Sequence, residues 1–72
     1  MTHQQKRALH ILAIHKVIRV RQSNPAYLVL EAYGHAKRSR WEYPCNFHIT
    51  KEGNEEHDRL ERSGYYQRQR HA

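Results

Sequence analysis

Histidine and cysteine are the side chains of this 72-residue chain best suited to bind a metal or to act in catalysis. One cysteine, Cys45, and seven histidines are present: His3, His10, His15, His35, His48, His57 and His71. The histidines are scattered, and neither they nor the cysteine form a close ligand pair such as Cys-x-x-Cys. Cys45 is expected to be a half-buried small side chain and not a nucleophile. We therefore expect no metal site and no cofactor.

Paired carboxylates, which can serve as general acid and base, occur only around Glu55, Glu56 and Asp58. This segment has the composition of an exposed helix, so its acids are expected to form a solvated face. The chain also lacks a glycine-rich loop of the kind that holds nucleotide phosphates. The sequence therefore favours a binding protein over an enzyme.

Positive charge is concentrated in the first part of the chain. The formal net charge is +6, and residues 1–30 contain five Lys or Arg side chains and no acid. Residues 51–72 carry equal numbers of cations and acids. A basic surface attracts polyanions, and nucleic acid is the first candidate. We expect such a partner to contact residues 1–40 and not the segment around Glu55.

The length allows one small domain with a thin stability margin. No apolar run approaches the roughly 20 residues that a membrane span requires, and the N-terminus has no signal-peptide pattern. The single cysteine excludes an intrachain disulfide and is typical of a reducing compartment. These features predict a cytoplasmic protein without membrane contact.

The N-terminal segment has the pattern of an amphipathic helix. Thr2 and Gln5 have the spacing of a capping box, and apolar residues recur over residues 8–14. We predict a helix over about residues 3–15. Residues 17–21 then alternate apolar and basic side chains, which favours a short strand. A continued helix is the alternative, because Ile14 and Ile18 stand four residues apart.

Asn24 and Pro25 mark the start of a second helix, as N-cap and first helical residue. We expect this helix over residues 25–33, with Gly34 able to take the left-handed conformation after it. Residues 35–40 then form a basic connector.

Apolar side chains alternate from Trp41 to Ile49, and Pro44 interrupts them with a turn signal. We therefore predict a β-hairpin with two short arms over residues 41–49. Its apolar face, with Trp41, Tyr43 and Phe47, is expected to be core. Stacking on single-stranded bases is the alternative for these three rings.

Thr50 can cap a third helix over residues 51–62, which Ser63 and Gly64 end. Residues 65–72 have no periodicity and are expected to be a flexible basic-aromatic tail, in which Tyr65 and Tyr66 are free to stack or to contact a partner. The predicted division is a domain over residues 1–64 and a tail over 65–72. The fold class is α+β, with three helices and a short β-hairpin.

The segment Phe47-His48-Ile49-Thr50-Lys51-Glu52-Gly53 resembles the junction between wing and following helix in winged helix-turn-helix regulators of the MarR-like and PadR-like groups. In those groups an apolar residue ends a strand, and Thr, two polar residues and Gly lead into an acidic helix. Residues 30–38 similarly resemble the junction between recognition helix and wing, so the match covers about residues 24–62.

The resemblance implies a small winged-helix-like domain that binds double-stranded DNA as a transcriptional regulator. A full motif has one more helix before the wing. Either residues 16–23 contain a short helical turn or the motif is truncated.

By the same resemblance, the second helix would lie in or near the major groove with Ser23, Asn24 and Tyr27 toward base edges. Asn24 could pair with adenine, although an N-cap role explains it more simply, and Tyr27 is equally suited to the core. Phosphate contacts would come from the cations near the two ends of that helix: Arg19, Arg21, Lys37, Arg38 and Arg40.

A protein partner is the alternative to DNA. The missing helix, Glu31 on the proposed reading helix and the aromatic tail favour an adaptor or inhibitor of nucleic-acid machinery on the same scaffold. Small basic proteins of this kind are common products of phages and mobile elements. The broad apolar face with Leu9, Leu12, Ile11 and Ile14 also suggests a homodimer.

Overall fold

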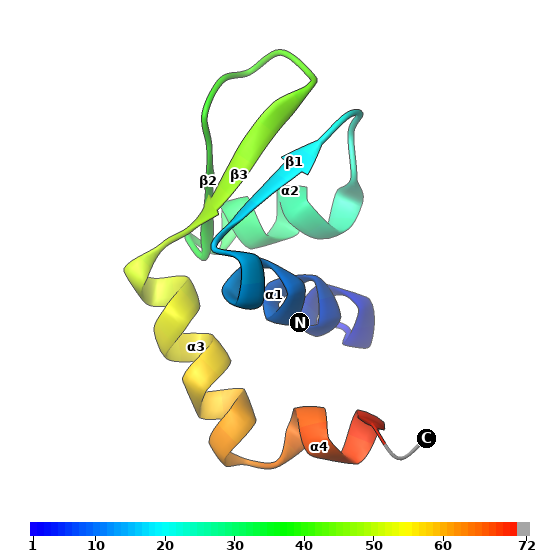
Figure 1. Cartoon of the computed structure of the whole chain (residues 1–72), viewed down its shortest axis with the longest axis vertical. Helices are drawn as coiled ribbons and strands as arrows, with labels where there is room; N and C mark the ends of the chain where they lie inside the picture. The colour runs from blue at the N-terminus through cyan, green and yellow to red at the C-terminus, as the bar shows by residue number, and fades with distance from the viewer. Residues whose placement is uncertain (71–72) are drawn as a thin grey trace.

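The computed structural model describes the backbone of residues 1–70 and the side chains of residues 1–67. Helices and strands follow one another in the order α1 (His3–His15), β1 (Val17–Val20), α2 (Pro25–Ala32), β2 (Ala36–Arg38), β3 (Cys45–Ile49), α3 (Lys51–Arg62) and α4 (Tyr65–Arg70) (Figure 1). The predicted α+β class is confirmed, and within the described residues there are four helices and three strands.

Local sequence signals determine where the helices begin. The Thr2 side chain accepts from the backbone N–H of Gln5, and the Gln5 side chain accepts from that of Thr2, which completes the predicted capping box of α1. Asn24 caps α2 by accepting from the Ala26 N–H at 3.0 Å, with Pro25 as the first helical residue. Both predicted helix starts are therefore confirmed.

The three strands form one antiparallel sheet in the order β1-β3-β2. β1 is the extended segment predicted after the first helix, so residues 17–20 do not continue α1. β2 and β3 form the hairpin, with a loop over residues 39–44. The hairpin predicted within residues 41–49 was therefore misplaced, because its first arm is part of the basic stretch that we interpreted as a connector.

The order of elements is that of a small winged-helix-like domain with a single helix between β1 and the hairpin. Residues 16–23 contain a strand and no helical turn, so the additional helix of a full winged-helix motif is not found there. α1 and α2 pack against each other and against the strands, and α2 lies behind the sheet in Figure 1. No described helix is long and apolar enough to cross a bilayer.

The core lies between the sheet and the first two helices. Its fully buried large side chains are Leu9, Leu12, Leu30 and Phe47. Because Leu9 and Leu12 are buried within the chain itself, only Ile11 and Ile14 of the face proposed for a homodimer stay exposed. Trp41, predicted to be core, is 80% exposed, and this prediction is wrong. The alternation that suggested burial crosses a loop before it enters β3.

The junction between β3 and α3 has the predicted structure. Thr50 accepts from the Gly53 N–H at 3.0 Å and donates to the Gly34 carbonyl at 2.6 Å. Gly34 has a φ of 81°, which favours glycine. A Cβ on Gly53 would lie 2.2 Å from the His35 carbonyl oxygen, so only glycine allows this close approach. These contacts join α3 to the end of α2.

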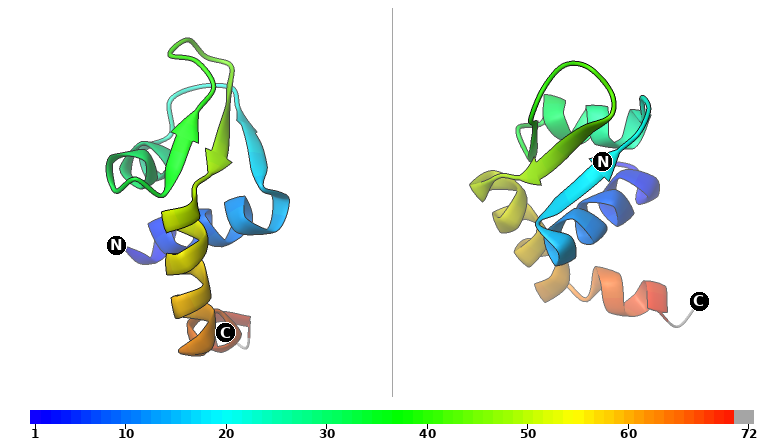
Figure 2. Two further views of the ribbon diagram at one scale, coloured as in Figure 1. Left: turned by 90° about the vertical axis from the view of Figure 1, so that its left-hand side faces the viewer. Right: turned by 45° about the horizontal axis from the view of Figure 1, so that its top comes forward.

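Residues 65–70 form α4, which corrects the prediction of an irregular tail from residue 65. The Tyr66 ring is buried, and its hydroxyl donates to the Lys6 carbonyl at 2.6 Å. Tyr66 is therefore part of the core and is not free to stack on a partner. α3 runs away from the sheet, so α4 lies at the opposite end of the molecule from the β2–β3 loop (Figure 2). The Arg68 and Arg70 side chains and residues 71–72 lie outside what the structure describes.

Candidate nucleic-acid interface

The sheet has one apolar face and one polar face. Side chains alternate along each strand, and those that point toward the helices belong to Ile18, Val20, Ala36, Cys45 and Phe47. The opposite positions are exposed and belong to Val17, Arg19, Lys37, Asn46 and His48. We call Arg19, Lys37, Asn46 and His48 the outer sheet face. The strand sequences contain no Asp or Glu, so this face is positively charged.

Strand register sets the positions of the two cations on the outer sheet face. Arg19 of β1 lies opposite Asn46 of the central strand, and Lys37 of β2 lies opposite His48. Neighbouring strands are about 4.8 Å apart, so the two cations flank β3 on either side. Polar side chains that can donate hydrogen bonds lie between them. In Figure 1 the sheet is in front of α2, so this face is turned toward the viewer.

The β2–β3 loop extends the polar surface beyond the strands. Arg40 donates two hydrogen bonds to the Pro44 carbonyl, at 3.0 and 2.8 Å, which closes the loop. The Ser39 hydroxyl accepts from the Asn46 N–H at 3.1 Å. Arg19, Ser39, Arg40 and Asn46 line one open pocket here. Two arginines, one from β1 and one from the loop, thus line the same open pocket, and their charge attracts an anion there.

Arg38 differs from the other predicted phosphate contacts. Its guanidinium binds both carboxylate oxygens of Glu31, at 2.8 and 2.6 Å, and the Arg38 side chain is only 11% exposed. The hydrogen bond from Arg38 holds the pKa of the Glu31 carboxyl below its usual value. The Trp41 ring covers the guanidinium at 4.6 Å from the ring centroid. Arg38 therefore ties β2 to α2, and its charge is paired inside the protein.

The residues predicted to read bases lie around the start of α2. Ser23 and Asn24 are exposed, but the Asn24 side-chain oxygen is engaged as the helix cap. A bidentate contact to adenine needs that oxygen as well as the amide nitrogen. Tyr27 is 8% exposed and contacts Phe47 with ring centroids 5.7 Å apart, so it belongs to the core. Arg21 is exposed just before the turn into α2.

α2 itself has no positive charge with which to bind a polyanion. Residues 25–32 include no Lys or Arg, and their one acid, Glu31, is paired with Arg38. Leu28 and Val29 are half-buried, and the following Tyr33 is exposed. The surface of this helix is therefore mostly apolar. The exposed cations among the predicted site residues gather on the sheet, its loop and residue 21: Arg19, Arg21, Lys37 and Arg40.

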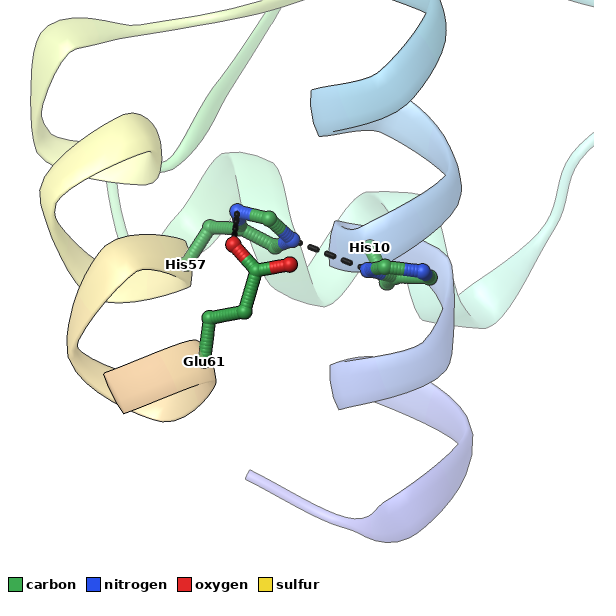
Figure 3. Close-up of side chains that lie close together, drawn as sticks. All are labelled: His10, His57 and Glu61. Carbon is green, nitrogen blue, oxygen red and sulfur yellow. Dashed lines mark hydrogen bonds and ion pairs between the residues drawn. The ribbon is translucent and has the colours of Figure 1, made fainter. Parts of the chain in front are cut away.

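From the sequence we did not identify a second group of polar side chains. His10 of α1 and His57 of α3 meet at 2.9 Å between Nδ1 and Nε2, with Glu61 beside them (Figure 3). The two histidines are 47 residues apart, so spacing alone does not connect them. The available signal was the position of His57 on the same side of its helix as Leu60.

Comparison of the chain with protein-family models, with curated proteins and with solved structures finds no match in any of the three.

Proposed function

We propose that this protein binds duplex DNA by contacting phosphates with the outer sheet face and the β2–β3 loop. The observation that carries the proposal is the strand register, which places exposed Arg19 and Lys37 on either side of β3, in strands without acids; the loop contains one exposed acid, Glu42. Arg40 adds a third cation at the end of the hairpin, close to Arg19. Such a surface supports electrostatic binding through counterion release.

This mode of binding differs from major-groove reading by α2. That helix has no cation, Tyr27 is buried and the Asn24 oxygen is used as a cap. Phosphate contacts position a protein on DNA, whereas contacts to base edges give sequence preference. We therefore infer a protein that holds the DNA backbone with its sheet and hairpin. If the protein regulates transcription, its position on the DNA would have to be determined by another protein, because phosphate contacts alone give no sequence preference.

The test is the salt dependence of binding to a random-sequence 30-base-pair duplex, measured by fluorescence anisotropy. The double variant Arg19→Gln, Lys37→Gln should bind more weakly than wild type. Each lost phosphate contact should lower the slope of log K against log salt by about 0.9. The matched control is Arg59→Gln, Arg62→Gln, which removes the same charge from exposed positions of α3. Its slope should stay at the wild-type value.

Equal losses in the two double variants would show that net charge alone attracts the DNA, and the proposed interface would be rejected. Absence of binding by wild type at low salt would reject DNA as the partner, despite the charge of +6.

One observation favours a protein partner as the second candidate. Trp41 is 80% exposed beside the Arg38–Glu31 pair, next to the apolar surface of α2. Exposed tryptophan is enriched among residues that dominate protein interfaces. In this alternative, Trp41→Ala abolishes capture of the partner, while the Arg19, Lys37 double variant retains it. Binding of duplex DNA that depends on Arg19 and Lys37 but not on Trp41 would favour the first candidate.

A further inference from the structure

His10, His57 and Glu61 bring three potential ligand atoms together between α1 and α3 (Figure 3). One nitrogen or oxygen from each residue lies within 4.8 Å of those of the other two. His57 and Glu61 stand four residues apart on α3 and therefore share one face of that helix. His10 comes from α1, so the group joins two helices that are distant in sequence.

The two imidazoles already lie near the separation that a metal requires. His10 Nδ1 and His57 Nε2 are 2.9 Å apart. Two nitrogens bound to a tetrahedral Zn²⁺ at about 2.0–2.1 Å would be about 3.3 Å apart. The nitrogens would have to separate by a few tenths of an ångström, and both rings would have to rotate, because a tetrahedral ion lies to one side of the line between its two nitrogen ligands. Glu61 is half exposed at its side chain, so its carboxylate can turn toward the same point.

The surroundings of His57 favour the ligand form of its ring. The other nitrogen, Nδ1, lies 4.0 Å from Asp58 Oδ1 and 4.0 Å from Glu61 Oε2. With its proton on Nδ1, on the side of these carboxylates, His57 directs the Nε2 lone pair at His10. Shortening either distance to a hydrogen bond would orient the ring, as carboxylates do for the histidine ligands of many metal sites. If Glu61 moves to the ion, Asp58 keeps this role.

The site is shielded on one side by α4. The Tyr66 ring stacks on His10 with ring centroids 4.3 Å apart and contacts His57 at 5.2 Å. His57 is 8% exposed, so its imidazole is largely withdrawn from water. The Tyr66 hydroxyl donates to the Lys6 carbonyl and is directed to that partner. The Tyr66 ring therefore restricts access of water to the imidazoles. Its hydroxyl is bonded to Lys6, so Tyr66 is not one of the proposed metal ligands.

Charge also distinguishes this end of the molecule. α3 carries five acids (Glu52, Glu55, Glu56, Asp58 and Glu61) against the three cations Lys51, Arg59 and Arg62, whereas residues 1–30, which include His10, contain no acid. A divalent cation is therefore attracted to the α3 side of this group more than to α1 or the sheet. Two imidazoles and one carboxylate are the ligands that Zn²⁺ accepts with a fourth position open to water.

The geometry points to a transition-metal site, formed by His10, His57 and Glu61, that binds Zn²⁺ and fastens α3 to α1. This site is independent of the proposed DNA interface, which lies on the sheet at the other end of the molecule. Binding of the ion replaces the hydrogen bond between His10 and His57 with three metal–ligand bonds, one from α1 and two from α3. The folded state is therefore stabilised by the metal.

The experiment is a calorimetric titration of the full, tag-free chain with Zn²⁺, together with thermal unfolding. Wild type should bind one ion per chain. At a free Zn²⁺ concentration of about 100 times the Kd, the melting temperature should rise by about 10 °C or more, and EDTA should reverse the rise. His10→Ala and His57→Ala should each weaken Zn²⁺ binding by at least about 100-fold, and Glu61→Gln by at least about 10-fold.

Matched controls separate this site from the other histidines and acids. His48→Ala removes an exposed histidine of the outer sheet face, and Glu55→Gln removes an exposed acid of α3. Both should bind Zn²⁺ like wild type. If His48→Ala weakens binding as much as His10→Ala, or if wild type binds no ion with one-to-one stoichiometry, the site is rejected.

A measurement on wild type alone covers the case in which a histidine variant does not fold. Long-range proton–nitrogen NMR spectra resolve the ring nitrogens of the histidines. One equivalent of Zn²⁺ should shift His10 Nδ1 and His57 Nε2 together and leave His48 unchanged. Shifts confined to other histidines would overturn the assignment.

Discussion

The sheet end and the helical end of this molecule have opposite surface chemistry. The sheet and its loop display Arg19, Lys37 and Arg40, and the strands contain no acid. α3 carries five acids against three cations, and there His10, His57 and Glu61 meet beside Tyr66. One end is therefore suited to a polyanion and the other to a small cation.

The difference follows from how the two ends obtain their stability. At the sheet end, alternate side chains are buried under α1 and α2, so the opposite positions are free to carry charge. At the helical end, α3 has few apolar residues, and Leu60 is the only buried large aliphatic side chain of that helix. Histidine and tyrosine rings fill the remaining contact with α1. Polar aromatic packing thus replaces an apolar core there.

The largest expected effect comes from the core that both ends share. Phe47→Ala removes a fully buried ring that extends from β3 and packs against Tyr27 of α2. We expect the free energy of unfolding to fall by about 3–5 kcal/mol, as measured by urea denaturation. Far-UV circular dichroism follows the helices, and fluorescence of the single tryptophan, Trp41, follows the hairpin loop. Coincident transitions would show one cooperative unit.

Separate transitions for the two probes would contradict this expectation. They would show that the helical end unfolds independently of the sheet, and that the two surfaces belong to two stability units rather than one.

The second effect concerns pH and distinguishes a shielded ion pair from an exposed one. Arg38 holds the pKa of the Glu31 carboxyl below its usual value of 4.5, mainly through their hydrogen bond. A carboxyl with a lowered folded-state pKa stabilises the protein above its unfolded-state pKa, and this stability is lost as the pH falls through the folded-state pKa. Glu31→Gln should therefore reduce stability at neutral pH and flatten its decline below pH 4.5.

Glu56→Gln is the matched variant at the helical end. Glu56 also has a lowered pKa through its hydrogen bond from Arg59, but the Arg59 side chain is 64% exposed. Solvent screens such a pair, so the loss at neutral pH should be smaller than for Glu31→Gln. Urea titrations across the acid range measure both. A larger loss of stability for Glu56→Gln than for Glu31→Gln would contradict the expectation that the shielded Glu31–Arg38 pair is the more stabilising one.

Much of the fold follows from local sequence signals. Capping by Thr2, Asn24 and Thr50 predicts the helix starts, and the alternation along β3 predicts that Cys45 and Phe47 face the core. The first hairpin arm was missed because Ala36, Lys37 and Arg38 have no apolar alternation. Arg38 instead points inward, where Glu31 neutralises it. α4 was missed because Tyr66 obtains its burial from α1, which is distant in sequence.

The residues of the candidate sites also differ in whether local sequence signals predict them. Arg19 was found because a charged residue in a strand pattern is expected on the solvent side, whereas Lys37 was found from its charge alone, in a segment interpreted as a connector. Tyr27 and Trp41 required the fold, because both are aromatic and only packing decides which one is buried. The His10–His57 contact depends on how α1 crosses α3, and no local rule specifies that crossing.

A smaller effect is expected at the helical end from Tyr66→Phe. This change removes the hydroxyl that donates to the Lys6 carbonyl at 2.6 Å and keeps the ring over His10. The expected loss is about 1 kcal/mol in the free energy of unfolding. Tyr65→Phe is the control, because its hydroxyl meets His3 Nδ1 at an exposed position. An equal loss in the two variants would show that the part-buried hydrogen bond of Tyr66 stabilises the protein no more than the exposed one of Tyr65.

The smallest effect is expected from Trp41→Ala, and it contrasts with the largest. Both residues lie in the apolar alternation that predicted a core strand, yet Phe47 is fully buried and Trp41 is 80% exposed. Loss of the Arg38 contact should reduce the free energy of unfolding by about 0.5 kcal/mol, measured by circular dichroism because the variant has no tryptophan. A loss near that of Phe47→Ala would mean that Trp41 is buried in solution. A second chain would then have to cover the loop, and the outer sheet face beside it would be less accessible to DNA.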